Sequence, residues 1–127
     1  MATWIIPCNE KYYKHREAFA NLTTIDWRQS TNVEIGDEVY IYVGQTVGAI
    51  LYKCEVLDVN IIEPNNNDVE YNIGSNLVPA EKYMRLKLIE TYPGDRYKLK
   101  DLLENGLKTV QGPSKASAEL LSFLVTK

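Results

Sequence analysis

The stretch Thr24–Val43, with the sequence TIDWRQSTNVEIGDEVYIYV, decides the fold. Its second half, Glu38–Val43, alternates aliphatic and aromatic residues, which predicts a strand because successive strand side chains point to opposite faces. One face should be core and the other aromatic. Its first half places hydrogen-bonding side chains around Trp27, and Ile25–Ser30 can be a strand or an extended loop. We expect the rest of the chain to hold these two pieces side by side.

Three further segments have strand patterns. Thr3–Ile6 is rich in aromatic and β-branched residues, and Pro7 should end this strand because proline cannot donate to a ladder. Ala49–Val56 follows a turn with two glycines, so it should pair with Glu38–Val43 at the centre of a sheet. Tyr83–Ile89 alternates apolar and basic residues, which predicts another strand with a basic polar face.

Helices are expected near the first strand and at the end of the chain. Asn9 should cap a helix over residues 10–21, and Gly106 should end one over residues 98–105. Ser114 should cap the last helix, whose leucines form an apolar stripe. Strands with long connections and helices at both ends predict an α+β fold, with helices packed on a mixed, curved sheet or small barrel.

Length and composition favour a single domain over residues 1–127. A single core grows to about 100–150 residues before chains split, and 45% hydrophobic with 24% charged residues is typical of globular proteins. No apolar run approaches the roughly 18 residues that a membrane helix needs, and the first residues do not have the pattern of a secretory leader. We therefore expect a cytoplasmic protein with no membrane partner. Cys8 and Cys54 should be buried, reduced thiols.

The charge distribution limits how nucleic acid could bind. A net charge of −3 and a pI near 5.2 argue against binding mainly by phosphate neutralisation, so any binding must use a local patch. Glu63–Pro79, with prolines and three consecutive asparagines, should be a long surface excursion. The acids at Glu55, Asp58, Glu63, Asp68 and Glu70 should keep this side away from phosphate.

No residue pattern indicates an enzyme, a metal site or a cofactor. The sequence has one histidine, His15, and no HxxxH, CxxC, glycine-rich phosphate loop or GxSxG motif. Because His15 stands between lysine and arginine on a predicted helix, we expect it to be solvated. What remains is aromatic chemistry: Trp4, Trp27 and nine tyrosines could wall a pocket for a flat heterocycle. The alternative is that Trp27 is simply a core residue.

Five segments together resemble a known family. They are Trp4–Asn9, Ile25–Ser30, Ile35–Val43, Gly48–Ile50 with Cys54–Val56, and the closing Gly106–Lys108 with Val110–Pro113. This pattern resembles the EVE domain of the PUA-like superfamily, nearest to the EVE-like domains at the N-terminus of HNH endonucleases that cut modified DNA. The resemblance implies a PUA-like β-barrel with flanking helices, related to the YTH domains that enclose a methylated base in an aromatic cage. The run Pro-Cys-Asn after the first strand departs from the lysine-serine-glutamate-proline run usual in standalone EVE domains.

The resemblance also implies a set of site residues. Trp27 would form a cage wall, with Gln29 and Ser30 at the base edge or the backbone. The first strand and its exit would border the pocket with Trp4, Pro7, Cys8 and Asn9, and the opposite side would carry Tyr42, Val43 and Gly44. Arg28, Lys11 and Arg85 are the predicted backbone-binding cations. Tyr42, Tyr52 and Tyr83 are candidates for a second cage aromatic.

These observations lead to one functional hypothesis and two alternatives. The hypothesis is a module that binds a flipped 5-methylcytosine or 5-hydroxymethylcytosine in DNA, as the reader of a modification-dependent restriction system. Because the 127 residues contain no HNH motif, a partner nuclease would lie in another part of the chain or on another chain. The alternatives are an RNA-binding PUA-like domain and a protein-interaction domain that binds no nucleic acid.

Overall fold

The computed structural model describes residues 1–44, 46–65, 67–73 and 80–126. The strands are β1 (Thr3–Cys8), β2 (Thr24–Arg28), β3 (Glu38–Val43), β4 (Ala49–Ile61), β5 (Tyr83–Thr91) and β6 (Ser114–Lys115). The helices are α1 (His15–Asn21), the single 3₁₀ turn η1 (Val69–Tyr71), α2 (Leu99–Glu104) and α3 (Ala118–Thr126). The predicted α+β class is confirmed. Of the expected surface excursion, residues 66 and 74–79 lie outside the described residues.

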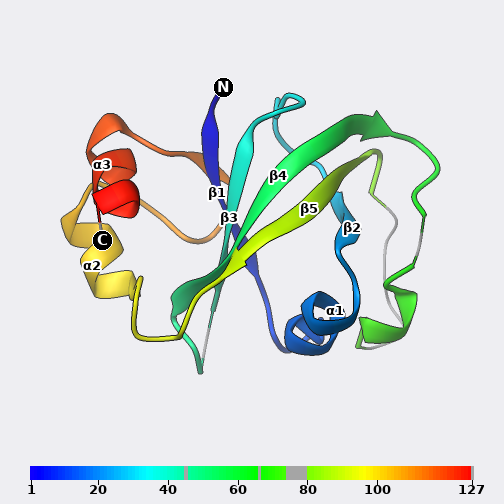
Figure 1. Cartoon of the computed structure of the whole chain (residues 1–127), viewed down its shortest axis with the longest axis horizontal. Coiled ribbons are helices and arrows are strands. Elements are labelled where there is room, and N and C mark those ends of the chain that lie inside the picture. Colours follow the sequence, from blue (N-terminus) through cyan, green and yellow to red (C-terminus); the bar gives the residue numbers. More distant parts are fainter. Residues whose placement is uncertain (45, 66, 74–79, 127) are drawn as a thin grey trace.

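The strands form one mixed sheet in the order β2-β5-β4-β3-β1-β6 (Figure 1). β1 runs parallel to β3, and the other neighbouring pairs are antiparallel. β3 pairs with β4, as predicted, and the register shifts in the β3–β4 and β4–β5 ladders. Such irregularities bend strands and increase their twist, which gives the sheet its curvature.

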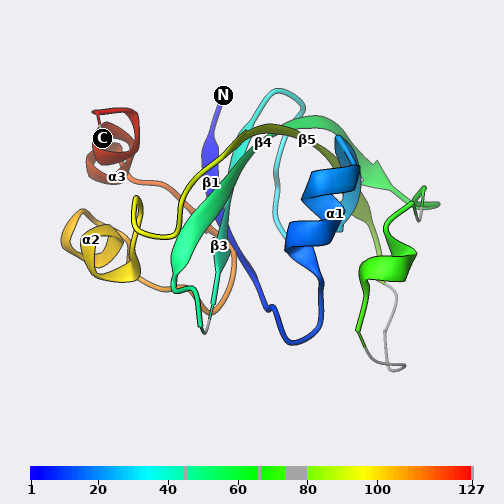
Figure 2. The same ribbon diagram turned by 60° about the horizontal axis from the view of Figure 1, so that its bottom comes forward.

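Each face of the sheet carries a hydrophobic core. α1 packs on one face with Phe19, while α2 and α3 pack on the other (Figures 1 and 2). In β3 the three aliphatic side chains belong to the core under α1, and Tyr40 and Tyr42 belong to the core under α2 and α3. The predicted alternation is confirmed, and its aromatic face is a second core.

Pro7 does not end the first strand, as the sequence had suggested. β1 continues to Cys8, and Pro7 pairs with Tyr42 of β3. The carbonyls of Ala2 and Cys8 accept hydrogen bonds from the β3 side, so the backbone nitrogen of Pro7 points to the opposite side. There β6 pairs only with residues 4 and 5. Proline therefore costs no ladder bond at this position.

Two predicted helix caps were also wrong. Asn9 instead accepts the backbone N–H of Lys11 at 3.0 Å, which forms a local turn, and α1 begins only at His15. Ser114 lies in β6, and the hydroxyl of Ser117 accepts the N–H of Leu120 at the start of α3. Asn and Ser side chains accept backbone N–H groups both in turns and at helix starts. The local sequence therefore does not tell which of these positions a given residue occupies.

Gly106 follows α2 with a φ of +107°, and a Cβ at this position would lie 2.8 Å from the Ser117 hydroxyl oxygen. The predicted glycine at the helix end is confirmed. We expect Gly106→Ala to lower the free energy of unfolding by roughly 1–3 kcal/mol through backbone strain and this contact. Gly112→Ala is the control, because nothing lies within 4 Å of its Cβ. Equal urea midpoints for the two variants would contradict the prediction.

No helix in the described part of the chain is both long and apolar enough to cross a membrane.

Candidate functional site

A pocket of about 580 Å³ opens beside Trp27. Its wall combines the end of β1 and the following turn, the end of β2, the start of β5 and the described part of the excursion around η1. The lining residues are Pro7, Cys8, Asn9, Tyr12, Tyr13, Asp26, Trp27, Arg28, Ile62, Pro64, Asp68, Val69, Asn72, Ala80 and Tyr83. A volume of this size is within the range of small-molecule sites, about 300–1,000 Å³.

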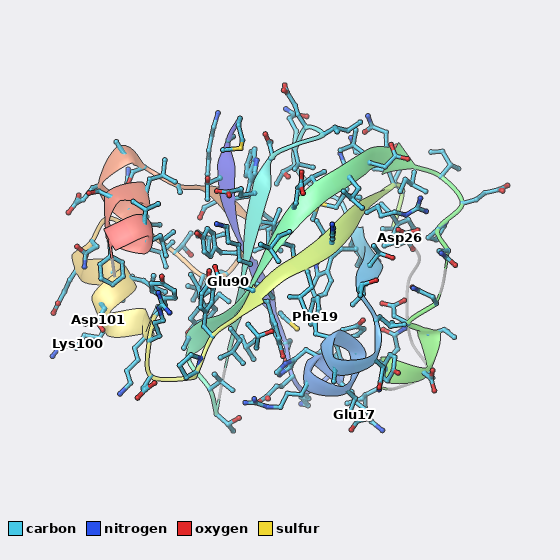
Figure 3. All side chains as sticks on the ribbon, in the orientation of Figure 1. Glu17, Phe19, Asp26, Glu90, Lys100 and Asp101 are labelled. Carbon is cyan, nitrogen blue, oxygen red and sulfur yellow. The ribbon has the colours of Figure 1, made fainter. Side chains whose placement is uncertain are left out.

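Trp27 belongs both to the core and to the pocket. Its ring is 5.5 Å from Tyr13 in an edge-on arrangement and 6.3 Å from Phe19 in a stacked one. Phe19 reaches from α1 toward the sheet (Figure 3). The indole is nevertheless only partly buried and lines the cavity. The two sequence interpretations of Trp27, core residue and pocket wall, are therefore compatible.

Tyr13 connects this aromatic wall to the excursion. Its hydroxyl donates to Oδ2 of Asp68 at 2.7 Å, and burial, together with this carboxylate, raises the pKa of Tyr13. Backbone bonds tie the same segments together: Lys14 N–H to the carbonyl of Tyr71 at 2.7 Å, and Ile73 N–H to the carbonyl of Tyr12 at 2.9 Å. The turn after β1 and the segment around η1 thus form one structural unit.

Asp26, in β2 (Figure 3), lines the pocket and has a structural role there. Arg85 donates to it twice, from Nε at 2.8 Å and from Nη2 at 3.1 Å, and the backbone N–H of Asn65 donates at 2.7 Å. Burial alone would raise the pKa of Asp26, but these hydrogen bonds outweigh it and the pKa is lowered. Arg85, predicted as a backbone-binding cation, therefore has its guanidinium committed to Asp26.

The structure brings some predicted site residues together and separates others. Pro7, Cys8, Asn9, Trp27 and Arg28 line the pocket, and so does Tyr83, one of the three candidates for the second aromatic. The candidates Tyr42 and Tyr52 lie in the two cores. Burial raises the pKa of the Cys8 thiol to about 12, so this side chain acts as an apolar wall.

The other predicted residues lie elsewhere. Trp4 donates from Nε1 to Asp37 at the far end of β1, about 13 Å along the strand from Cys8 at roughly 3.3 Å per residue. Buried Gln29 exchanges hydrogen bonds with Asn60 and does not reach the pocket, and Ser30 is exposed. The end of β3 does not form pocket wall. Tyr42 and Val43 are core side chains, and the backbone N–H of Gly44 donates to the carbonyl of Cys8.

Sequence reasoning missed Tyr12, Tyr13 and Asp68. The two tyrosines fell within the predicted helix of residues 10–21, whereas the structure has a turn there. Asp68 was counted only as one acid of an acidic excursion. The adjacent tyrosines after the first strand were the available signal.

A second, more open hollow of about 750 Å³ adjoins the first. Residues 9–17 and Thr46 line it, and it shares Asn9, Tyr12 and Tyr13 with the pocket. It carries the exposed cations Lys11, Lys14 and Arg16. Of the predicted backbone-binding residues, Lys11 lies here.

His15 is buried beneath this hollow, so its expected solvent exposure was wrong. It is 2% exposed, with Nδ1 2.6 Å from the Tyr52 hydroxyl and Nε2 2.9 Å from Glu10. Glu10 also accepts from the hydroxyl of Thr46. The histidine points inward because α1 begins at His15 and turns this side of the helix onto the sheet.

Burial lowers the pKa of His15 despite its bond to Glu10. Below about pH 6.5, the ordinary pKa of histidine, the unfolded chain binds a proton that the folded chain does not, so the protein loses stability as the pH is lowered. We expect the free energy of unfolding to decrease from pH 7 to pH 5, as measured by urea denaturation. His15→Gln should flatten this dependence. An unchanged slope in the variant would contradict the assignment.

Comparisons of the sequence found no matching protein-family model, and no curated protein matches. The structure, in contrast, defines the class: an α+β protein with a PUA-like fold, shared with ASCH domains. A mutant of ASCH from Zymomonas mobilis superposes with a TM-score of 0.64 and 13% identity, covering 99% of this chain and 98% of that chain.

Two further solved structures have the same fold. A hypothetical protein from Leishmania major superposes with a TM-score of 0.61 at 14% identity, covering 98% of this chain and 92% of that chain. A protein from Agrobacterium tumefaciens superposes with a TM-score of 0.62 at 13% identity, covering 97% of this chain and 90% of that chain. At such identities the likeness establishes the fold alone. The PUA-like fold that the resemblance implied is confirmed, while neither comparison supports the EVE branch or a relation to HNH endonucleases.

Proposed function

We propose that this protein is a nucleic-acid-binding module that takes one unstacked base into the pocket beside Trp27. The observation that carries the proposal is a partly exposed indole in a 580 Å³ pocket with Tyr13 and Tyr83 also in its wall. A base needs such aromatic surfaces for its faces and fixed polar groups for its edge. The PUA-like fold is compatible with this use.

The sugar-phosphate backbone would follow the adjoining hollow. Lys11, Lys14 and Arg16 lie on that side of the shared residues Asn9 and Tyr12. Of the acids in the excursion, Asp68 lines the pocket itself. The hollow holds these three cations and the two acids Glu10 and Glu17, so it is locally less acidic than a chain of net charge −3. Such a local site could bind a polyanion, because only the contacted phosphates need neutralisation.

The finer hypothesis is that the bound base is a modified cytosine in DNA and that the protein recognises it as part of a restriction system, as the EVE resemblance implies. Pro7, Ile62, Pro64 and Val69 supply apolar wall for a 5-methyl group, whose burial is worth about 0.8 kcal/mol. RNA is the alternative ligand within the same pocket. A nuclease, in a further part of the chain or on another chain, would be the effector.

The test is a binding titration at about 100 mM salt, using fluorescence anisotropy of labelled oligonucleotides. The set contains single-stranded RNA, single-stranded DNA, and duplex DNA with one unmodified, 5-methylated or 5-hydroxymethylated cytosine. We expect binding with tryptophan quenching. Tighter binding to a modified duplex supports the finer hypothesis, and preference for RNA supports the alternative. Binding to none of them overturns the proposal.

A protein partner is the second candidate. Tyr12, Ile62 and Val69 at the pocket are 54%, 72% and 63% exposed, respectively. Exposed apolar side chains gathered at one cavity are typical of interaction sites. Failure of every nucleic acid in the titration would move the assignment to this candidate.

A further inference from the structure

Asp68 presents a carboxylate to the same pocket. Its Oδ2 accepts the Tyr13 hydroxyl at 2.7 Å. Within residues 1–44, 46–65, 67–73 and 80–126, no hydrogen-bond donor reaches its Oδ1. Unlike Asp26, whose two oxygens are both occupied by Arg85, Asp68 therefore keeps an acceptor for a ligand.

The surrounding structure holds this carboxylate in place relative to Trp27. The carbonyl of Asp68 accepts the N–H of Tyr71 in η1, and the buried Tyr71 is bonded to Lys14 through its carbonyl and to Asn21 through its hydroxyl. The Tyr13 ring packs against the Trp27 ring at 5.5 Å. Both the stacking surface and the acceptor are thus organised before a ligand arrives.

A carboxylate is an acceptor only, so its partner on the ligand must present a hydrogen-bond donor, and on the edge of a base this is an N–H. The exocyclic 4-amino group of cytosine does so, whereas uracil and thymine carry a carbonyl oxygen at that position. We propose that Asp68 makes the pocket selective, among the pyrimidines, for the amino-bearing cytosine over uracil and thymine. This inference rests on the proposed function and adds the feature of the base that is read.

The experiment uses oligonucleotides that differ at one unpaired position: cytosine, uracil, or pyrimidin-2-one, which lacks the 4-substituent. A good edge contact discriminates by about 1–3 kcal/mol, so cytosine should bind about 5- to 150-fold tighter than uracil. The affinity for pyrimidin-2-one should fall between the two, because this base lacks the amino group that bonds to the carboxylate but also lacks the carbonyl oxygen that the carboxylate repels.

Asp68→Asn is the diagnostic variant. Its amide can turn either an oxygen or an N–H toward the base, so the cytosine-to-uracil ratio should fall toward one. Tyr13→Phe is the matched control, since it removes the 2.7 Å bond to Asp68 but leaves the carboxylate. It should keep a ratio above one, even if the affinity for both bases falls. Circular dichroism checks that each variant is folded.

The possible failures are distinguishable. If no oligonucleotide binds, or binding ignores Trp27, the proposed function is overturned. If binding needs Trp27 but the wild-type ratio is one, only the role of Asp68 is overturned. If folded Asp68→Asn keeps the wild-type cytosine-to-uracil ratio, the role of Asp68 is also overturned, because the carboxylate then does not distinguish the two bases.

Discussion

Trp27→Ala is expected to weaken nucleic-acid binding by roughly 5- to 150-fold, because stacking one base on an aromatic side chain is worth about 1–3 kcal/mol. The effect should be similar for every base, since each base has a π-face. The measurement is the dissociation constant for the best oligonucleotide of the titration, at fixed salt. Tryptophan quenching should disappear with the same substitution.

Three control variants separate stacking from folding. Trp27→Phe keeps an aromatic face and should retain most of the affinity. Trp27→Leu keeps apolar contact with Tyr13 and Phe19 but offers no ring, so it should bind as weakly as the alanine variant. Trp4→Phe changes the other tryptophan, outside the pocket, and should leave binding unchanged. Full affinity in folded Trp27→Leu would remove the stacking role.

Asp37→Ala should give the largest loss of stability, about 3–5 kcal/mol in the free energy of unfolding. The Asp37 carboxylate is 2% exposed and accepts three N–H groups: those of the Ala2 and Glu34 backbones, both at 2.9 Å, and Trp4 Nε1 at 3.0 Å. Each buried donor left without an acceptor costs about 1–3 kcal/mol. Urea denaturation measures the effect.

Two neighbouring changes provide the controls for this prediction. Asp37→Asn keeps one carbonyl acceptor and should lose less stability than the alanine variant. Glu38→Ala breaks a 3.2 Å ion pair with Lys53 that is partly exposed, and such pairs are worth about 0–1 kcal/mol. If Glu38→Ala lost as much stability as Asp37→Ala, the loss would come from changing any side chain at the start of β3 and not from the three hydrogen bonds of Asp37.

Part of the candidate site was predictable because it is local. Trp27 and Arg28 stand at the end of one strand, and Pro7 to Asn9 at the end of another, so a strand pattern and a resemblance were enough to place them. Gln29 and Trp4 were misplaced for a different reason. Their partners, Asn60 and Asp37, are 31 and 33 residues away, and no short-range pattern reveals such bonds.

The sequence by itself determined the α+β class, the β3–β4 pair and the glycine after α2, because alternation, turn residues and helix ends are properties of neighbouring residues. Only the tertiary structure decided that His15 is buried and that the aromatic face of β3 is a second core. It also decided that Tyr13 and Asp68 join Trp27 in one pocket. The physical reason is that backbone bonds between residues 12–14 and 71–73 bring together segments nearly sixty residues apart, a pairing set by packing rather than by local preference.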